Sequence, residues 1–340
     1  MLKKTTYLVL ILTGSLSISS WKTATCQDIQ FSQFYAAPLY LNPALTGNTE
    51  QFRIAGTYRK QWPKIPGAWT SQTFAYDQSI RKINSGIGLL LIHDKAGTAG
   101  LRFTNIGLCY AFKFPITRKV FSSFGVRASY TTRAINADEL VFWDQIVRDD
   151  PTSLEILSSN VVKYADFSTG YIVYSKTSWI GAAFDHLTTP NQSFIGLDTK
   201  LPLKYSVHAG HRFPLKKTVK GNVQNSLSVA ANYKGQLQWD QFDVGVYMTI
   251  NGIVGGLWYR GIPGLKAYKP GYSNNDALVF LLGYQMKEVI SIGYSFDLTI
   301  SRLTIASGGS HEISLIYEYA QPKYKRDNMK KDFMMPCMKF

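Results

Sequence analysis

The segment Glu288-Val-Ile-Ser-Ile-Gly-Tyr-Ser-Phe-Asp297 decides the fold of this chain. Large apolar side chains, such as Ile292 and Tyr294, alternate in it with small or polar ones, such as Ser295. Successive side chains of a β-strand point to opposite faces, so this strand has one apolar and one polar face. About ten residues, tilted by about 45°, are also the length that crosses a bilayer within a closed barrel. The segment therefore predicts one strand of a membrane β-barrel.

The same alternation recurs along nearly the whole chain and predicts an all-β fold, a transmembrane antiparallel β-barrel of about 14 strands. An even number of strands agrees with bacterial single-chain barrels, which begin and end on the periplasmic side. The expected strands are Gln51–Arg59, Trp69–Ile80, Gly86–His93, Leu101–Phe114, Val120–Thr132, Tyr164–Ser175, Ser178–Leu187, Leu203–Phe213, Asn225–Lys234, Trp239–Thr249, Ile253–Arg260, Ala277–Gln285, Lys287–Phe296 and Ser310–Tyr319.

The connections between these strands give a second test. If the first strand rises from the periplasm, the odd-numbered connections are extracellular and should be the longer ones. Most connections follow this rule, but Pro214–Gln224 is a long even one and Gly235–Gln238 a short odd one. The longest connection, Arg133–Lys163, contains an apolar cluster from Leu140 to Trp143, so we expect it to fold inward or against a partner.

The N-terminus predicts a signal peptide over residues 1–26, because Lys3 and Lys4 precede an apolar stretch and a small-residue stretch that ends at Cys26. Cleavage after Cys26 is the expectation, although a lipid-modified Cys26 is the alternative. We then expect a periplasmic N-terminal segment over residues 27–48, an outer-membrane barrel over residues 49–320 and a basic C-terminal tail over residues 321–340.

Composition and charge agree with a barrel. The formal net charge is +15, and removal of residues 1–26, which contain three lysines and no acid, leaves +12. A basic balance can indicate nucleic acid binding, but these cations lie in turns, strand ends and the tail rather than in one stripe, so we expect no nucleic acid partner. The 21 tyrosines are of the residue type that gathers at membrane interfaces.

The sequence contains no motif for catalysis, for a cofactor or for a metal ion. His208 and His211 are three residues apart in a predicted strand, so they point to opposite faces and do not share a metal ion. Cys109 and Cys337 remain after processing, and whether they form a disulfide stays open. We therefore expect a protein that is not an enzyme.

Five ordered motifs resemble the PorP/SprF family of type IX secretion membrane proteins, and together they cover essentially the whole mature chain. The motifs are Gln30–Tyr35 with Pro38–Ala44 and Gly47, Tyr58–Trp62 with Phe74 and Asp77, Asp185–Leu187 with Pro190, Gly293–Asp297 with Thr299, and Gly308–Glu312.

This resemblance implies an outer-membrane barrel from a bacterium of the Bacteroidota type, in contact with outer-membrane lipid. It also implies work with periplasmic ring and lipoprotein components of the type IX apparatus, in the export or surface anchoring of adhesins or effectors, and in some relatives in gliding motility. A secreted surface adhesin, or its C-terminal domain, is the implied cargo partner. Within the motifs, the expected partner-docking residues are Phe31, Tyr40, Asn42, Pro43, Arg59, Trp62, His186 and His311.

Two questions stay open from the sequence. The first is function, because a general porin or small-solute transporter is the alternative, and an open lumen would favour it. The second is the role of the two ends of the mature chain. Residues 27–48 either pack under the barrel mouth, kept extended by Pro38 and Pro43, or form a platform that docks the secretion ring. The basic tail is either a disordered end or a hook for an acidic partner.

Overall fold

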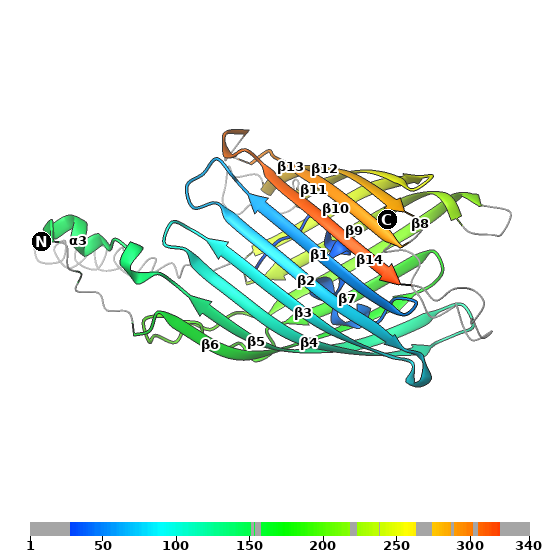
Figure 1. The fold of residues 1–340 in the computed structure, drawn as a ribbon, viewed down its shortest axis with the longest axis horizontal. Helices are drawn as coiled ribbons and strands as arrows, with labels where there is room; N and C mark the ends of the chain where they lie inside the picture. The colour runs from blue at the N-terminus through cyan, green and yellow to red at the C-terminus, as the bar shows by residue number, and fades with distance from the viewer. Residues whose placement is uncertain are drawn as a thin grey trace, which may run out of the picture.

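The computed structural model describes residues 28–150, 153, 158–217, 223–237, 239–262, 274–286, 289–301 and 305–319. Its fourteen antiparallel strands form a closed barrel (Figure 1), which confirms the predicted fold class and strand number. The strands are β1 (Phe52–Gln61), β2 (Trp69–Ile80), β3 (Ser85–Ala96), β4 (Leu101–Pro115), β5 (Phe121–Ala134), β6 (Val161–Tyr174), β7 (Ser178–Asp185), β8 (Lys204–Lys217), β9 (Val223–Gln236), β10 (Trp239–Ile250), β11 (Ile253–Ile262), β12 (Asn274–Met286), β13 (Ile290–Thr299) and β14 (Ser310–Tyr319).

Helical elements are short. They are η1 (Phe34–Ala36), α2 (Pro38–Leu41), η2 (Pro43–Leu45), η3 (Arg81–Ile83), η4 (Ala137–Glu139), α3 (Trp143–Arg148) and η5 (Ile305–Ser307). Within the described part of the chain, no helix has the length and apolar character that a membrane span requires.

The first and last strands close the barrel. Each strand pairs with its neighbours in the sequence, and β1 pairs in addition with β14, from Phe52 opposite Tyr319 to Gln61 opposite Ser310. Closure leaves no free strand edge, so every strand can satisfy its backbone hydrogen bonds within the sheet, as a lipid environment demands.

The alternation of apolar and polar residues in the sequence corresponds to the outer and inner faces of the barrel wall. On β13, Ile292 and Tyr294 are 51% and 41% exposed on the outside, whereas Ser295 and Asp297 are 0% and 1% exposed inside. The same division holds for β5, β10 and β14. The apolar parity therefore faces outward, where lipid would cover it, and the polar parity faces the lumen.

The two ends of the barrel differ in their connections. We call the end where β1 ends the loop end, because the connections over residues 62–68 and 186–203 and the described residues of 135–160 and 300–309 lie there. We call the end where β1 begins the turn end. Strand β8 continues through a bulge past Pro214 to Lys217, so the even connection expected to be long spans only residues 218–222. The connection over residues 237–238 is short, as expected from the sequence.

The described residues 135–150 of this loop do not fold into the lumen, so the expectation of inward folding was wrong, whereas contact with a partner stays a prediction. Its helix α3 projects beyond the loop end of the barrel (Figure 1). Trp143 is 74% exposed and Val141 72% exposed, so the apolar cluster does not fill the barrel.

The lumen is filled instead by residues 28–49, which we call the lumen segment (dark blue in Figure 1). Its first residue, Asp28, contacts Lys204 at the loop end, and its Gly47 contacts Asp77 near the turn end. Between these points η1, α2 and η2 follow one another inside the wall. The segment therefore lies deeper than one packed under the barrel mouth.

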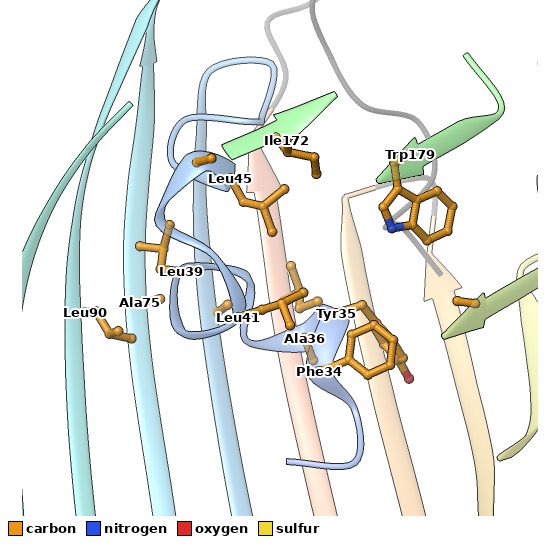
Figure 2. Packing of buried hydrophobic residues seen from close by; sticks show 14 of the residues in the cluster. Phe34, Tyr35, Ala36, Leu39, Leu41, Leu45, Ala75, Leu90, Ile172 and Trp179 are labelled. Atoms are coloured by element: carbon orange, nitrogen blue, oxygen red, sulfur yellow. The ribbon is translucent and has the colours of Figure 1, made fainter. Parts of the chain in front are cut away.

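Apolar contacts hold the middle of the lumen segment. Phe34, Leu39 and Leu45 are at most 7% exposed and belong to one cluster with side chains of the inner wall. Figure 2 shows Leu45 beside Ile172 of the wall. The ring of Phe34 also packs edge-on against Trp258, with ring centroids 5.0 Å apart. These wall residues occupy the inward parity together with other apolar side chains such as Ile92 and Trp179, so this part of the wall is apolar where the segment packs.

Glycines in the wall allow the backbone of the segment to approach closely. A Cβ atom built on Gly125 would lie 2.3 Å from the backbone nitrogen of Ala44, and one on Gly86 would lie 2.4 Å from the carbonyl oxygen of Thr46. Real side chains do not tolerate such distances, and backbone atoms cannot rotate away. Glycine is required at both positions for the segment to lie where it does.

We expect Gly125→Ala to displace the lumen segment and to destabilise the protein by about 1–3 kcal/mol, the usual cost of an overfilled core. Protease cleavage within residues 28–49 should accelerate. Gly255→Ala is the matched control, because a Cβ atom there meets no atom within 4 Å. Equal cleavage rates for the two variants would contradict this account of the contact.

Candidate functional site

The candidate site is the contact between the lumen segment and the wall, which three clusters of charged side chains organise. In the first cluster, the carboxylate of Glu312 accepts hydrogen bonds from the backbone N–H groups of Ser32 and Gln33, at 2.7 and 2.9 Å. Arg59 pairs with Glu312 at 3.1 Å and with Asp297 at 2.8 Å. Arg59 and Glu312 are direct partners across β1 and β14, where the barrel closes.

Two more wall strands join this first cluster. Arg260 on β11 donates to Asp297 at 2.9 Å, to Asp243 on β10 at 2.8 Å and to the Ser32 hydroxyl at 2.9 Å. The Ser32 hydroxyl donates in turn to Asp297 at 2.6 Å. Opposite charges thus compensate one another in a region where an unpaired charge would be costly. The segment contributes a hydroxyl and backbone N–H groups to this network.

The second cluster lies at the loop end around Asp28. Its carboxylate is 2.8 Å from the Lys204 ammonium and 2.9 Å from His186 Nε2. His186 Nδ1 lies 2.6 Å from Asp166, and Lys204 also pairs with Asp185. His186 follows β7 with a positive φ of 63°, a backbone conformation that turns its ring toward the lumen segment.

The electrostatics of this cluster shift two pKa values outside the strands. Burial opposes ionisation of Asp28, but His186 and Lys204 outweigh it and hold the pKa of the Asp28 carboxyl well below its usual range. Burial likewise opposes a charged His186, but Asp28 and Asp166 raise its pKa to about 9. His186 is therefore an imidazolium at neutral pH, paired with two carboxylates.

The third cluster lies near the turn end. Asp77 accepts the backbone N–H of Gly47 at 2.8 Å and two hydrogen bonds from Arg53, both at 2.9 Å. The Lys113 ammonium donates to the carbonyl oxygen of Gly47. The wall thus contacts both backbone groups of one glycine, which has a positive φ of 67°.

Asn42 and Pro43 lie between these clusters. The Asn42 side chain caps η2 by accepting from Ala44 N–H at 2.9 Å, and its amide nitrogen lies 3.1 Å from the carbonyl oxygen of Ala182 and from His208 Nε2. His208 faces the lumen, whereas His211 on the outward parity contacts Ser178. The two histidines lie on opposite faces, as predicted.

The eight residues predicted to dock a partner occupy different positions. Phe31, Asn42, Pro43 and Arg59 are buried inside the barrel, and Tyr40 packs there against Phe31 with its hydroxyl donating to the Ile29 carbonyl. His186 belongs to the second cluster, and the docking role of all eight stays a prediction.

The last two of the eight lie at the loop end. The backbone N–H of Trp62 donates to Gly309 at 2.8 Å, which joins two of the sequence motifs. His311 lies on the outer face of β14, where Tyr294 OH is 2.8 Å from its Nδ1.

Sequence reasoning missed several residues that hold the segment, notably Asp28, Lys204 and Arg260. Asp28 and Lys204 are 176 residues apart, and no local spacing connects them. A signal did exist in the inward parity of the wall, where large apolar side chains such as Trp258, Ile172 and Leu90 stand among the polar ones.

The arrangement binds and positions the chain's own segment. Among the described residues, no group of three or more His, Cys, Asp or Glu side chains forms a metal-binding cluster. Cys109 is buried in the wall, and Cys337 lies outside the described residues. A cavity of about 300 Å³ remains at the loop end, bordered by Asp28, Trp62 and Lys234.

We expect Arg59→Met to destabilise the barrel by about 3–5 kcal/mol, because it leaves Glu312 without its cationic partner inside the protein. Urea unfolding, followed by the change in gel mobility of the folded barrel, measures this loss. Lys200→Met is the control, because Lys200 and Asp198 form an exposed pair whose loss should cost less than about 1 kcal/mol. Equal losses would show that the first cluster contributes no more than a surface pair.

We expect the N-terminal end of the lumen segment to loosen at alkaline pH. The contribution of His186 to the stability of this contact is complete below its ordinary pKa of 6.5. It is lost as pH rises through about 9, the raised pKa of His186 in the folded protein. The contribution of Asp28 to stability has the opposite pH dependence: it is complete above pH 3.8, the ordinary pKa of the carboxyl, and is lost as pH falls below that value.

A nitroxide spin label at position 30 reports this change. Its mobility should be low near pH 7 and should rise above pH 9, whereas His186→Asn should raise it already at pH 7. A label that is equally immobile at pH 7 and pH 10 would contradict the assignment.

Comparisons with known proteins identify the family of this chain. A crystal structure of a Pseudomonas aeruginosa FadL homologue is 14% identical with a TM-score of 0.46, covering 82% of this chain and 92% of that one. The toluene transporter TodX of P. putida is 9% identical with a TM-score of 0.46, covering 83% and 93%. A search of curated proteins gave no match. The family model of the type IX secretion system membrane protein PorP/SprF matches residues 23–317, and the chain belongs to that family.

Proposed function

We propose that this protein is a non-enzymatic outer-membrane subunit of the type IX secretion machinery, exported by a cleaved signal peptide. It supports the export or surface anchoring of adhesins or effectors through contacts with periplasmic ring proteins, and in some settings gliding. Membership of the PorP/SprF family supports the assignment to the type IX machinery. The barrel fold, together with the family, supports the outer membrane as the location of the protein.

The observation that carries the proposal is the filled lumen. Residues of the lumen segment such as Gln33, Asn42 and Thr46 are 0% exposed, and they bind wall strands on several sides of the barrel. A porin needs an open, water-filled bore. A barrel that keeps its own chain in the bore is suited to hold other components at the membrane, and this favours an anchoring subunit over a porin.

The family motifs support the same conclusion. Gln33, Arg59, Asp297 and Glu312 come from four of the five motifs and meet in the first cluster. His186, from the remaining motif, contacts Asp28 next to the first motif. Residues of all five motifs thus help to hold the lumen segment inside the barrel. The filled barrel is what a secretion subunit would present to its partners.

Deletion of the gene in its native bacterium should retain type IX cargo in the periplasm while leaving the uptake of small solutes unchanged. Quantifying cargo in the medium, on the surface and in the periplasm measures the first effect. A radiolabelled sugar or amino acid measures the second. Normal cargo export with impaired uptake would overturn the proposal in favour of a small-solute transporter.

Planar-bilayer recordings on the purified protein give a test without the cell. We expect no steady current from the wild-type protein and a steady current from a variant that lacks residues 28–49, because the deletion empties the lumen. Gel mobility confirms that the deletion variant still forms a barrel. A large steady current through the wild-type protein would contradict the filled lumen.

A further inference from the structure

Four cations face outward on the barrel wall close to the loop end. They are Lys60 on β1, Lys95 on β3, Arg102 on β4 and Lys163 on β6, and we call them the cationic patch. All four are exposed and occupy the parity that faces lipid along the rest of each strand. Within the described part of the chain, none of them forms an ion pair with a carboxylate. The patch therefore places uncompensated positive charge on the membrane side of the wall.

The strand register places two of these charges directly opposite each other. Lys95 on β3 pairs with Arg102 on β4. Thr70 on β2 stands between Lys95 and Lys60, because it pairs with both of them. Neighbouring strands are about 4.8 Å apart, so the backbones that carry these three cations lie within about 15 Å of one another. Like charges that face each other across strands destabilise a sheet, and an anion bound between them would relieve this repulsion.

The paired cations lie where the outer face of the wall changes from polar to apolar. The next outward residues toward the middle of the wall are His93 on β3 and Thr104 on β4, whose Nδ1 and hydroxyl oxygen are 3.0 Å apart. The outward residues after these are Leu91 and Ile106, and Ile106 is 50% exposed. Lipid headgroups meet acyl chains at such a change of polarity. The patch therefore lies at the level of the headgroups.

The surroundings of the patch provide no acidic group on the lipid-facing side. The outward positions of β1 to β6 contain no Asp or Glu, and the acidic residues of these strands, such as Asp94, belong to the inward parity. The adjacent connections over residues 62–68 and 97–100 contain no acid either. The counter-ion of the patch must therefore come from outside these strands and connections.

The outer face of other strands differs at the same end of the barrel. On β8, β9 and β11 the outward side chains nearest the loop end are Tyr205, Tyr233 and Tyr259. Tyrosine suits a membrane interface of any composition. A row of cations instead selects for lipids that carry negative charge, so the patch is a local feature of β1 to β6.

The ligand that fits this arrangement is a lipid whose phosphate groups lie close to its acyl chains. A phosphate placed between Lys95 and Arg102 would meet a guanidinium, which can donate two parallel hydrogen bonds, and an ammonium, which acts as a point charge. The acyl chains would then lie along Leu91 and Ile106. A soluble anion would use only the first of these contacts. Lipid also surrounds the outward face of a membrane barrel, so the patch meets headgroups without any assembly step.

We propose that the cationic patch binds the phosphate groups of lipopolysaccharide, the phosphorylated lipid of the outer leaflet of bacterial outer membranes. From the proposed function this inference uses only the location in the outer membrane. The longer connections of such barrels are extracellular, which places the loop end at the outer leaflet. The inference goes beyond the secretion role, because a failure of lipid binding would leave the export test untouched.

The test measures binding of lipopolysaccharide, purified from the same bacterium, to the purified barrel in a nonionic detergent. The patch variant carries Lys60→Gln, Lys95→Gln and Arg102→Gln. The matched control carries Lys82→Gln, Arg118→Gln and Lys119→Gln, which remove the same number of exposed charges at the turn end. We expect the patch variant to raise the Kd about tenfold and the control to leave it unchanged. Dephosphorylated lipopolysaccharide should bind the wild-type protein about as weakly as the intact lipid binds the patch variant.

The unfolding temperature of the barrel, followed by gel mobility, gives a second readout. Lipopolysaccharide should raise it for the wild-type protein and the control but not for the patch variant, because a ligand stabilises only the form that binds it. Without lipid, Arg102→Gln alone should unfold no earlier than the wild-type protein, because it removes the repulsion from Lys95. A loss of binding in the patch variant is then not a loss of folding.

Three results would overturn the patch as a lipid site. The first is a wild-type barrel that binds no lipopolysaccharide, or that binds the dephosphorylated form equally well. The second is equal weakening by the patch variant and the control, which indicates a general charge effect. The third is full lipid binding by the patch variant, together with the loss of a membrane protein that co-purifies with the wild-type barrel, which assigns the cations to a protein contact.

Discussion

Charge compensation inside the barrel is the constraint on which the rest of the structure depends. The inner wall places Arg59, Arg260, Asp297 and Glu312 away from water, and such groups are stable only when paired and hydrogen-bonded. The wall alone does not complete this pairing. Glu312 accepts two backbone N–H groups, and Asp297 a hydroxyl, from the lumen segment. The polarity that a water-filled pore would satisfy with solvent is satisfied here by protein.

The same dependence runs from the segment to the wall. A chain of short helical turns leaves backbone groups without intrahelical partners, and these need other donors and acceptors when buried. Arg127 donates to the carbonyl oxygen of Leu39, Ser123 to that of Ala44, and Lys113 to that of Gly47. Each part thus satisfies buried polar groups of the other.

The strands could be predicted from the sequence, because a wall with lipid on one side and a polar lumen on the other forces a period of two. Strand ends were less predictable. The expected strand ended at Phe213, before Pro214, a residue type that lacks the N–H group of a ladder bond, but a register shift lets β8 continue to Lys217.

The lumen segment was predictable only as a motif. Its residues have no single period, because η1, α2 and η2 contact different strands of the wall. Its partners Lys204, Arg127 and Asp77 come from strands far along the chain, and only the closed barrel brings them together. The motifs did not predict that Arg59 and Asn42 are buried. A motif identifies residues of a family but does not say whether they face the lumen, the lipid or a partner.

The pairing of Arg59 with Glu312 has a consequence for how the protein is made. These two residues belong to the first and last strands of the cylinder, so they meet only when the final zipper of strand pairing forms. The backbone of Ser32 and Gln33 binds the same carboxylate. Filling the interior and sealing the cylinder therefore depend on the same carboxylate, which links residues that precede the first strand to the last strand.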